Sequence, residues 1–456
     1  MGSLSCCKSC LVIIATNVLI VLYFLSTCRK SVSSSADTVL QIREKLEIDE
    51  TFPIVFYNTA FIDYRFDPPR LRVFSMNPCV TREEFIVVEM RTRRVRLRGE
   101  PTEGECPWHW ASQCLYNSYI WSADVSLIDE DDEIVIHLNN RTVLLNVQRV
   151  HERVESGLTV CVQPVYFYSE FHNIALFIEA WRAQGASRFI VYFHSSTREV
   201  RMLLEYYRAM GLLTLKPWPS FGSLSPSVPR FHFPSFDSST YRVGHTLAQN
   251  LCILEMSTEF GAIADFDEII VSDGRFLLED VRKTMKSEAI GALSFSHLLV
   301  KFDPKISTID FSGVLNPVFL NRSGPSKTVF KRNSVDVIVT HSVRKFIHNE
   351  TTARARGALL HFRHNSYSEN AVEVRSELKL FSENGRKHVW RMQKRLDEVL
   401  GSPVPEYNST YLHVLTECID KIIGEGKCRS TVAYCRQWME ELTEWSYERS
   451  PTVFVV

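Results

Sequence analysis

Residues 261–274, GAIADFDEIIVSDG, decide the fold of this chain. A short apolar run leads into Asp265-Phe266-Asp267-Glu268, and a second apolar run follows and ends in a Ser-Asp-Gly turn. Three acids therefore stand among residues that favour burial. Because a buried acid needs a compensating charge, the stretch predicts a site for a divalent cation that bridges to a phosphate.

Asp265 and Asp267 are the predicted metal ligands. In an extended chain, residues i and i+2 project to the same side, so both carboxylates would reach one ion while Phe266 points into the core. Such hard oxygen ligands suit Mn²⁺ or Mg²⁺. The alternative is that Asp-x-Asp arises by chance and caps a turn.

The surrounding sequence alternates between strands and helices over residues 156–368, and charged helices in residues 369–456 finish the chain. Gly185 and Gly211 end the first two helices. The expected strands cover residues 158–168, 188–195, 212–218 and 291–302, and the expected helices cover residues 171–185, 198–211 and 241–260. The acids then follow the fourth strand of a doubly wound sheet, and ligands bind at the carboxyl ends of such strands.

This pattern predicts an α/β fold with a Rossmann-like, doubly wound mixed sheet. An Asp-x-Asp after the fourth strand is typical of nucleotide-sugar glycosyltransferases of the GT-A type, in which a cation neutralises the diphosphate of the donor. The sequence has no glycine-rich dinucleotide fingerprint after the first strand and no Gly-Lys-Ser/Thr phosphate loop, which argues against NAD, FAD and P-loop chemistry. A two-metal hydrolase fits less well because no further cluster of His and Asp accompanies the acids.

Residues 51–155 have a different pattern. Short β-rich runs separated by Pro, Asn and charged residues predict a small β-sandwich-like domain. The chain carries 52 Lys and Arg against 53 Asp and Glu, and this balance argues against a nucleic-acid partner. The basic run 91–98 is therefore interpreted as a solvated strand face. Trp108 and Trp110 keep open the alternative of a catalytically inactive protein that binds glycans.

The first fifty residues indicate a membrane anchor. Residues 11–28 are apolar and uncharged, and they are long enough for a slightly short membrane helix. They predict a signal anchor between a cytosolic tail, 1–10, and a polar stem, 29–50, with a cleaved signal peptide as the alternative. The expected localisation is that of a single-pass type II membrane protein with a lumenal catalytic domain in the Golgi or ER.

Sequons and cysteines favour this lumenal placement. Four sequons follow the apolar segment, at Asn140, Asn321, Asn349 and Asn408. Eight cysteines also follow it, and an even number in a secretory setting suits disulfides. The connectivity stays open. Two pairs are close enough in sequence to form small loops, Cys106 with Cys114 and Cys428 with Cys435.

Five segments together resemble glycosyltransferase family 92, particularly its large nematode branch. They are TVCVQPVYFYSEFHNIALFIEAWRAQGASRFIVYFHSST (159–197), AQNLCILE (248–255), ADFDEIIV (264–271), KTVFKRNSVDVIVTHSV (327–343) and LLHFRH (359–364). The resemblance covers residues 52–450. It implies an inverting GT-A glycosyltransferase, and characterised relatives are β-1,4-galactosyltransferases that use UDP-galactose and Mn²⁺ on fucose-bearing N-glycans or on pectic galactan.

The resemblance also implies roles for individual residues. Asp265 and Asp267 match the acid pair of the family, and Glu268 matches its following Glu, which is expected to bind substrate.

The triplet His361-Phe362-Arg363 matches a His-Tyr-Arg motif of the family. His361 is the predicted third metal ligand, with His341 as runner-up, and Arg363 would hold the diphosphate as a bidentate donor. A hydrogen-bonded core histidine and an ordinary surface ion pair are the alternatives. An inverting enzyme also needs a carboxylate base, and the sequence does not rank the candidates Asp303, Asp310 and Asp336.

Overall fold

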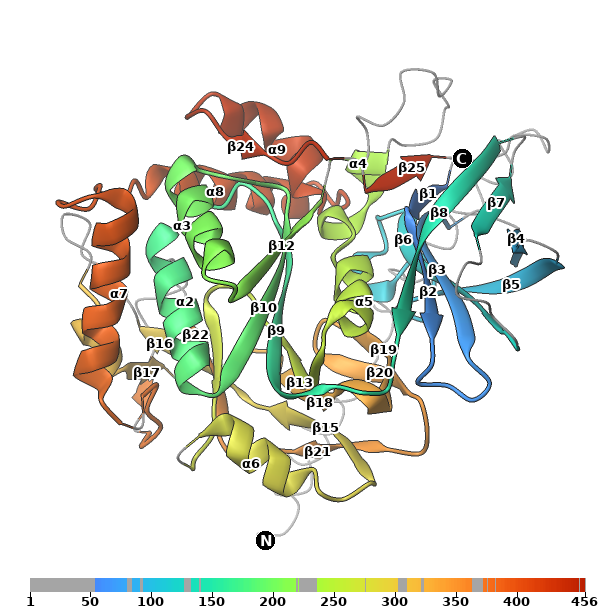
Figure 1. Cartoon of the computed structure of the whole chain (residues 1–456). Coiled ribbons are helices and arrows are strands. Elements are labelled where there is room, and N and C mark those ends of the chain that lie inside the picture. The colour runs from blue at the N-terminus through green and yellow to red at the C-terminus, as the bar shows by residue number, and fades with distance from the viewer. Residues whose placement is uncertain are drawn as a thin grey trace, which may run out of the picture.

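The computed structural model describes residues 54–79, 84–90, 93–126, 133–138, 141–218, 220, 236–274, 276–301, 310–320, 324–362, 372–374, 376–381, 383–450 and 452–455. Two large sheets organise these residues, and helix α5 (His245–Glu255) packs between them (Figure 1). The sheet nearer the N-terminus is antiparallel for the most part, whereas the central sheet begins with parallel strands.

The first sheet is made of nine strands in the order β2-β8-β7-β4-β5-β6-β3-β1-β25. Their bounds are Val55–Tyr57 (β1), Thr59–Asp63 (β2), Arg70–Pro78 (β3), Phe85–Met90 (β4), Arg93–Pro101 (β5), Tyr116–Asp124 (β6), Ile134–Leu138 (β7), Arg141–Val150 (β8) and Val453–Val455 (β25). Strand β2 also pairs with β3, so the sheet closes on itself instead of forming the two stacked sheets of a sandwich. The closure is possible because β3 is long enough to pair with β1 near its end and with β2 near its start.

The central sheet has seven strands in the order β12-β10-β9-β13-β18-β15-β21. Their bounds are Glu155–Val165 (β9), Ala186–Phe193 (β10), Leu213–Pro217 (β12), Thr258–Ile263 (β13), Ile290–Phe295 (β15), Lys327–Lys331 (β18) and Thr351–Arg354 (β21). Strands β12, β10, β9 and β13 are parallel, and β18 runs antiparallel to both of its neighbours. The predicted α/β class is therefore confirmed, and β13, which precedes the acids, is the fourth strand of this sheet in chain order.

Helices cover both faces of the central sheet (Figure 1). The core on one face includes α2 (Phe171–Ala183), α3 (Arg198–Ala209), α6 (Leu277–Thr284) and α7 (Gly385–Leu400), which packs against α2 and α3. The core on the other face includes α5, α8 (Thr410–Gly424) and α9 (Thr431–Glu440). The residues of strand β10 show why both faces of the sheet are covered. Phe189 and Val191 belong to the first core, whereas Ile190 and Tyr192 belong to the second, because successive side chains point to opposite faces.

A third sheet of five strands adjoins the central one in the order β14-β22-β16-β17-β23. The strands are Glu268–Val271 (β14), His297–Lys301 (β16), Val318–Leu320 (β17), Ala358–Phe362 (β22) and Glu373–Val374 (β23). The chain leaves the central sheet for this one between β13 and β14, and again between β15 and β16. The single strand expected over residues 291–302 is therefore two strands, and the acid motif lies at the other crossing point.

The remaining elements are short: Ser195–Ser196 (β11), Phe236–Ser239 (α4), Val335–Val339 (β19), Ser342–Phe346 (β20), Ser446–Tyr447 (β24) and the 3-10 turns His109–Ala111, Tyr241–Val243, Ser312–Leu315 and Arg332–Ser334. The helix expected over residues 241–260 is shorter in the structure, where α5 begins at His245 and ends at Glu255. Arg242, Val243 and Gly244 are all left-handed, with φ of 42°, 57° and 74°. A right-handed helix cannot pass through such residues.

All eight cysteines that follow the apolar segment form disulfides, which confirms the prediction of disulfides. The pairs are Cys79–Cys106, Cys114–Cys428, Cys161–Cys252 and Cys418–Cys435. Neither of the two small loops suggested by sequence proximity forms. The fold instead places Cys114 beside a cysteine 314 residues away, so the disulfide joins the first sheet to the C-terminal helices.

The localisation prediction requires a correction. Residues 1–53, which include the predicted tail, anchor and most of the stem, lie outside the described residues. No helix in the described part is long and apolar enough to cross a membrane, and this finding contradicts the prediction of a single-pass type II membrane protein. Asn140 and Asn321 also lie outside the described residues, whereas Asn349 and Asn408 are exposed.

Candidate active site

A pocket of about 510 Å³ opens at the carboxyl ends of β9 and β13, next to the acid motif. Four carboxylates line it, together with two cationic side chains and four histidines. They are Glu170, Asp265, Asp267, Glu268, Arg242, Lys327, His245, His297, His341 and His361. The position agrees with the expectation that ligands bind where parallel strands end.

The acid motif is a tight turn and not the expected extended segment. The Glu268 N–H donates to the Asp265 carbonyl oxygen at 2.9 Å, and the Glu268 carboxylate accepts the Asp265 N–H at 3.0 Å. The turn carries the chain from β13 to β14, which belong to different sheets. Phe266 is buried as predicted, against Tyr168 and Phe177.

Lys327 is the counter-charge of this turn. Its side chain is 1% exposed, and its Nζ lies 3.0 Å from Glu268 and 3.8 Å from Asp265. Burial opposes the charge of Lys327, but the carboxylates of Glu268 and Asp265 outweigh it and raise the lysine pKa. Burial likewise opposes ionisation of Asp265, whereas Lys327 and Arg242 outweigh it and lower the aspartate pKa. The turn is therefore held as an ion cluster.

Gln163 restrains the same acid from the other side. Its amide nitrogen donates to Asp265, and its amide oxygen accepts from Gln249 at 2.7 Å. Asp265 is thus fixed by an amide on β9 and a lysine on β18.

Asp267 faces a different partner. Its Oδ2 lies 3.0 Å from His361 Nε2, and the other ring nitrogen of His361 lies 2.9 Å from His297 Nε2. The register of two strands explains this contact, because β14 and β22 pair Glu268 with His361 and the Phe362 N–H donates to the Asp267 carbonyl at 2.7 Å. The structure therefore brings together two of the three predicted ligands, Asp267 and His361.

The side chains of the predicted metal site are only partly gathered. Within the described ranges, no three residues of the types His, Cys, Asp and Glu lie close enough together to hold a metal ion. Asp267 and His361 do face one another at the pocket, with a carboxylate oxygen and an imidazole nitrogen as donors. That pair fits a hard divalent ion, since such ions use one or two carboxylates and complete their shell with water and substrate phosphates.

Of the other predicted site residues that the structure describes, only His341 lies at the pocket. His341 lines the pocket, and burial together with Lys327 lowers its pKa to about 4, so it is neutral at pH 7. Asp310 accepts hydrogen bonds from Ser312, and Asp336 pairs with Arg72 at 2.6 Å; neither lines the pocket. Asp303 and Arg363 lie outside the described residues.

Sequence reasoning missed one wall of the pocket. Leu412, Leu415 and Ile419 line it from α8, spaced as neighbours on one helical face. That spacing indicates an apolar helical face. It does not show that the face lies at the pocket, because the helix is more than 140 residues away from the acids in sequence. The pocket therefore has an ionic floor and an apolar wall.

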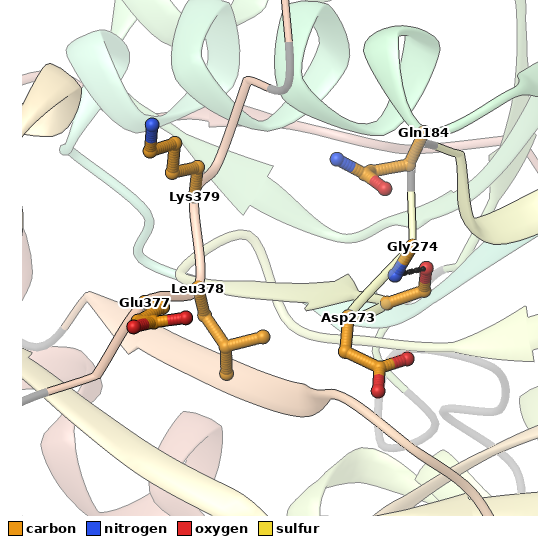
Figure 2. Close-up of a pocket in the computed structure, with 7 residues that line it drawn as sticks. Gln184, Asp273, Gly274, Glu377, Leu378 and Lys379 are labelled. Carbon is orange, nitrogen blue, oxygen red and sulfur yellow. Dashed lines mark hydrogen bonds between the residues drawn. The ribbon is translucent and has the colours of Figure 1, made fainter.

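A second hollow, of about 370 Å³, follows β14 and shares no residue with the first. Figure 2 shows Glu377, Leu378 and Lys379 on one side and Gln184 with Gly274 on the other. The Gln184 amide forms hydrogen bonds with the backbone here, since it donates to the Leu380 carbonyl and accepts from the Leu277 N–H. The described residues that line this hollow form a structural junction and show no arrangement that suggests chemistry.

Comparisons with known proteins identify a family. The profile described as glycosyltransferase family 92 matches residues 156–400, which is more than half of the chain. No curated protein matches.

Solved structures give weaker likenesses. TarS 1–349 from S. aureus is 15% identical over 39% of this chain and 47% of that chain, with a TM-score of 0.22, and the same protein in complex with UDP is 14% identical over the same shares with the same score. Glucosyl-3-phosphoglycerate synthase from Mycobacterium tuberculosis, in complex with Mg²⁺ and UDP, is 12% identical over 53% of this chain and 79% of that chain, with a TM-score of 0.24. The chain spans less than half of the first of these structures, and TM-scores this low carry no weight for substrate or metal.

Proposed function

Because this chain belongs to glycosyltransferase family 92, we propose that the pocket beside Asp265 and Asp267 is the active site at which it transfers a hexose from a nucleotide-sugar to a glycan. The observation that carries this proposal is the meeting of Asp267 and His361 at the pocket, since two separate strands are paired in the register that joins them. The fold would then be of the GT-A type, and the reaction would invert the anomeric centre.

Asp267 and His361 are the proposed metal ligands. Asp265 lines the same pocket and would bind the ion directly or through water. A bound Mn²⁺ or Mg²⁺ would neutralise the donor diphosphate and stabilise it as the leaving group. Glu268 is assigned a positioning role and not the substrate contact first expected, because it is buried and accepts the Asp265 N–H.

The finer assignment follows the resemblance in the sequence. The proposed donor is UDP-galactose, the linkage is β-1,4, and the acceptor is a glycan such as a fucose-bearing N-glycan. The apolar wall of α8 supports a sugar acceptor, because the C–H face of a pyranose ring packs on aliphatic side chains while its hydroxyl groups meet the acids.

The test is nucleotide release by the full chain with Mn²⁺ and a panel of UDP- and GDP-sugars, with and without fucosylated acceptors. We expect release from UDP-galactose that requires acceptor, stops in EDTA and returns with Mn²⁺. Asp267→Asn should reduce the rate at least about 100-fold without loss of stability, because it removes a ligand and not a core group. Leu415→Ser should raise the acceptor KM and leave the donor KM unchanged.

Asp273→Asn is the matched control, since Asp273 is an exposed acid of the second hollow. Full activity in EDTA, or full activity of Asp267→Asn, would exclude the metal assignment. Tight glycan binding with no release from any donor would favour the inactive glycan-binding alternative.

A further inference from the structure

Arg242 is the cation of the pocket that forms no ion pair with a described carboxylate. Of the two permanently charged basic residues in the lining, Lys327 is engaged by Glu268 at 3.0 Å. Within the described residues Arg242 has no ion pair within 4 Å, and its nearest recorded ring contact is Tyr241, 5.5 Å from its guanidinium carbon. A guanidinium in a protein pocket gains from a close anionic partner, because its desolvation is otherwise poorly compensated.

The backbone at Arg242 is strained, and the strain is held in place from several sides. Arg242 has φ 42° and ψ 48°, and Val243 next to it has φ 57°. Non-glycine residues rarely adopt this left-handed region, and they keep it only where the surroundings impose it.

Three contacts hold Arg242 and Val243 in the left-handed conformation. The Arg242 N–H donates to the Arg429 carbonyl at 3.0 Å, the Val243 carbonyl accepts from the Trp218 indole at 2.8 Å, and the Gly244 N–H donates to the Tyr241 carbonyl at 2.9 Å. Arg429 follows Cys428, whose disulfide to Cys114 fixes the segment. Strain maintained in this way at a pocket indicates a functional constraint on where the side chain lies.

The electrostatic surroundings agree with an anion site beside a cation site. Burial opposes the charge of Arg242, but Tyr241, Tyr166, Asp265 and Glu268 outweigh it and raise the arginine pKa. Asp265 and Glu268 line the same pocket as Arg242 but lie beyond ion-pair distance of it, so Arg242 can bind a further anion there. A diphosphate fits, because a guanidinium donates two parallel hydrogen bonds to phosphate oxygens.

We propose that Arg242 binds the diphosphate of the nucleotide-sugar and holds it against the acid motif. The inference rests on the proposed function, since it assigns a residue to the donor of that reaction. It also supplies the guanidinium role that the sequence had suggested for Arg363.

The test measures binding and not turnover. Isothermal titration of the full chain in Mn²⁺ gives the Kd of UDP and of uridine, which lacks the phosphates, for the wild type, Arg242→Asn, Arg242→Lys and the control Arg153→Gln. Asn is chosen because it tolerates the left-handed conformation, so the variant should keep or raise the melting temperature. Arg153 is an exposed arginine that lines a different hollow.

We expect Arg242→Asn to weaken UDP binding by roughly 10- to 100-fold, as expected for lost hydrogen bonds to a charged group, and to leave uridine binding within about twofold. Arg242→Lys should be intermediate, since it keeps the charge and loses the paired donors. Arg153→Gln should bind UDP as the wild type does.

Unchanged UDP binding in Arg242→Asn would overturn the inference, and so would an equal loss for UDP and uridine together with a lower melting temperature, which would indicate a structural role. If Arg242→Asn does not fold, Arg242→Lys decides: a Kd for UDP equal to the wild-type value overturns the inference. A wild-type protein that binds neither UDP nor uridine would instead remove the proposed function on which the inference depends.

Discussion

Lys327 stabilises the acid turn from a position that water does not reach. Because Glu268 is also buried, Lys327→Met should leave an uncompensated carboxylate and lower the free energy of unfolding by about 3–5 kcal/mol. Urea unfolding of the wild type and of Lys327→Met measures this difference in the free energy of unfolding. The control is the double variant Lys327→Met with Glu268→Gln, which removes both charges and should recover much of the loss. Equal stability of the single and double variants would contradict the role assigned to the lysine.

At the residue scale, the sequence predicted the acids and the histidine but not their partners. Asp265, Asp267 and His361 belong to a compact pattern that can be recognised without knowledge of the fold. Lys327 and Arg242 have no such pattern, because a single basic residue in a strand or helix is ordinarily a solvated one. Only the fold, which brings β18 and the segment before α5 to the pocket beside the turn, gives them a role.

Gly357 immediately precedes β22, whose pairing with β14 brings Asp267 to His361. Its φ is +108°, and a Cβ at this position would meet the Val271 carbonyl and lie 2.7 Å from the Ser272 Cα. Gly357→Ala should therefore lower the free energy of unfolding by about 1–3 kcal/mol and reduce transferase activity, because the strand register carries the site.

Thermal unfolding and nucleotide release measure these two effects. Gly313→Ala is the control, since Gly313 has no atom within 4 Å of the added Cβ and no positive φ. If Gly357→Ala matched Gly313→Ala in both measurements, the strand register would not be a determinant of the site.

At the element scale, the strands and helices of the central sheet follow the apolar periodicity, and these were predictable. The points where the chain changes sheets were not. Residues 291–302 contain no Pro, Asn or Asp that would mark a break, so their pattern cannot show that Ser296 separates two strands of different sheets. The helical pattern before α5 likewise conceals three left-handed residues, because that conformation is imposed by contacts with Trp218 and Arg429.

The disulfide Cys114–Cys428 joins parts of the molecule that are far apart in sequence. Replacing both cysteines with alanine should lower the free energy of unfolding by about 2–4 kcal/mol. It should also weaken UDP binding, because Arg429 next to Cys428 accepts the Arg242 N–H.

The matched control replaces Cys418 and Cys435, which close a loop of only 17 residues. In the chain-entropy description, a shorter loop stabilises less, so this variant should lose less stability. Unfolding in urea under non-reducing conditions, with UDP titration, compares the two. An equal loss of UDP affinity in both variants would argue against a specific link from Cys428 to Arg242.

At the scale of the whole molecule, β25 adds a consequence for how the protein is made. Residues 453–455 pair with β1 at residues 55–57, so the first sheet receives its last strand from the end of the chain. A ribosome adding about 5–20 residues per second needs roughly 15–60 s to travel from the end of β8 to β25. During that interval β1 has an unpaired edge and Cys114 has no native partner while Cys106 is nearby in sequence. Newly synthesised chains therefore pass through a stage at which a chaperone covering that edge and an isomerase correcting that cysteine would raise the yield of folded protein.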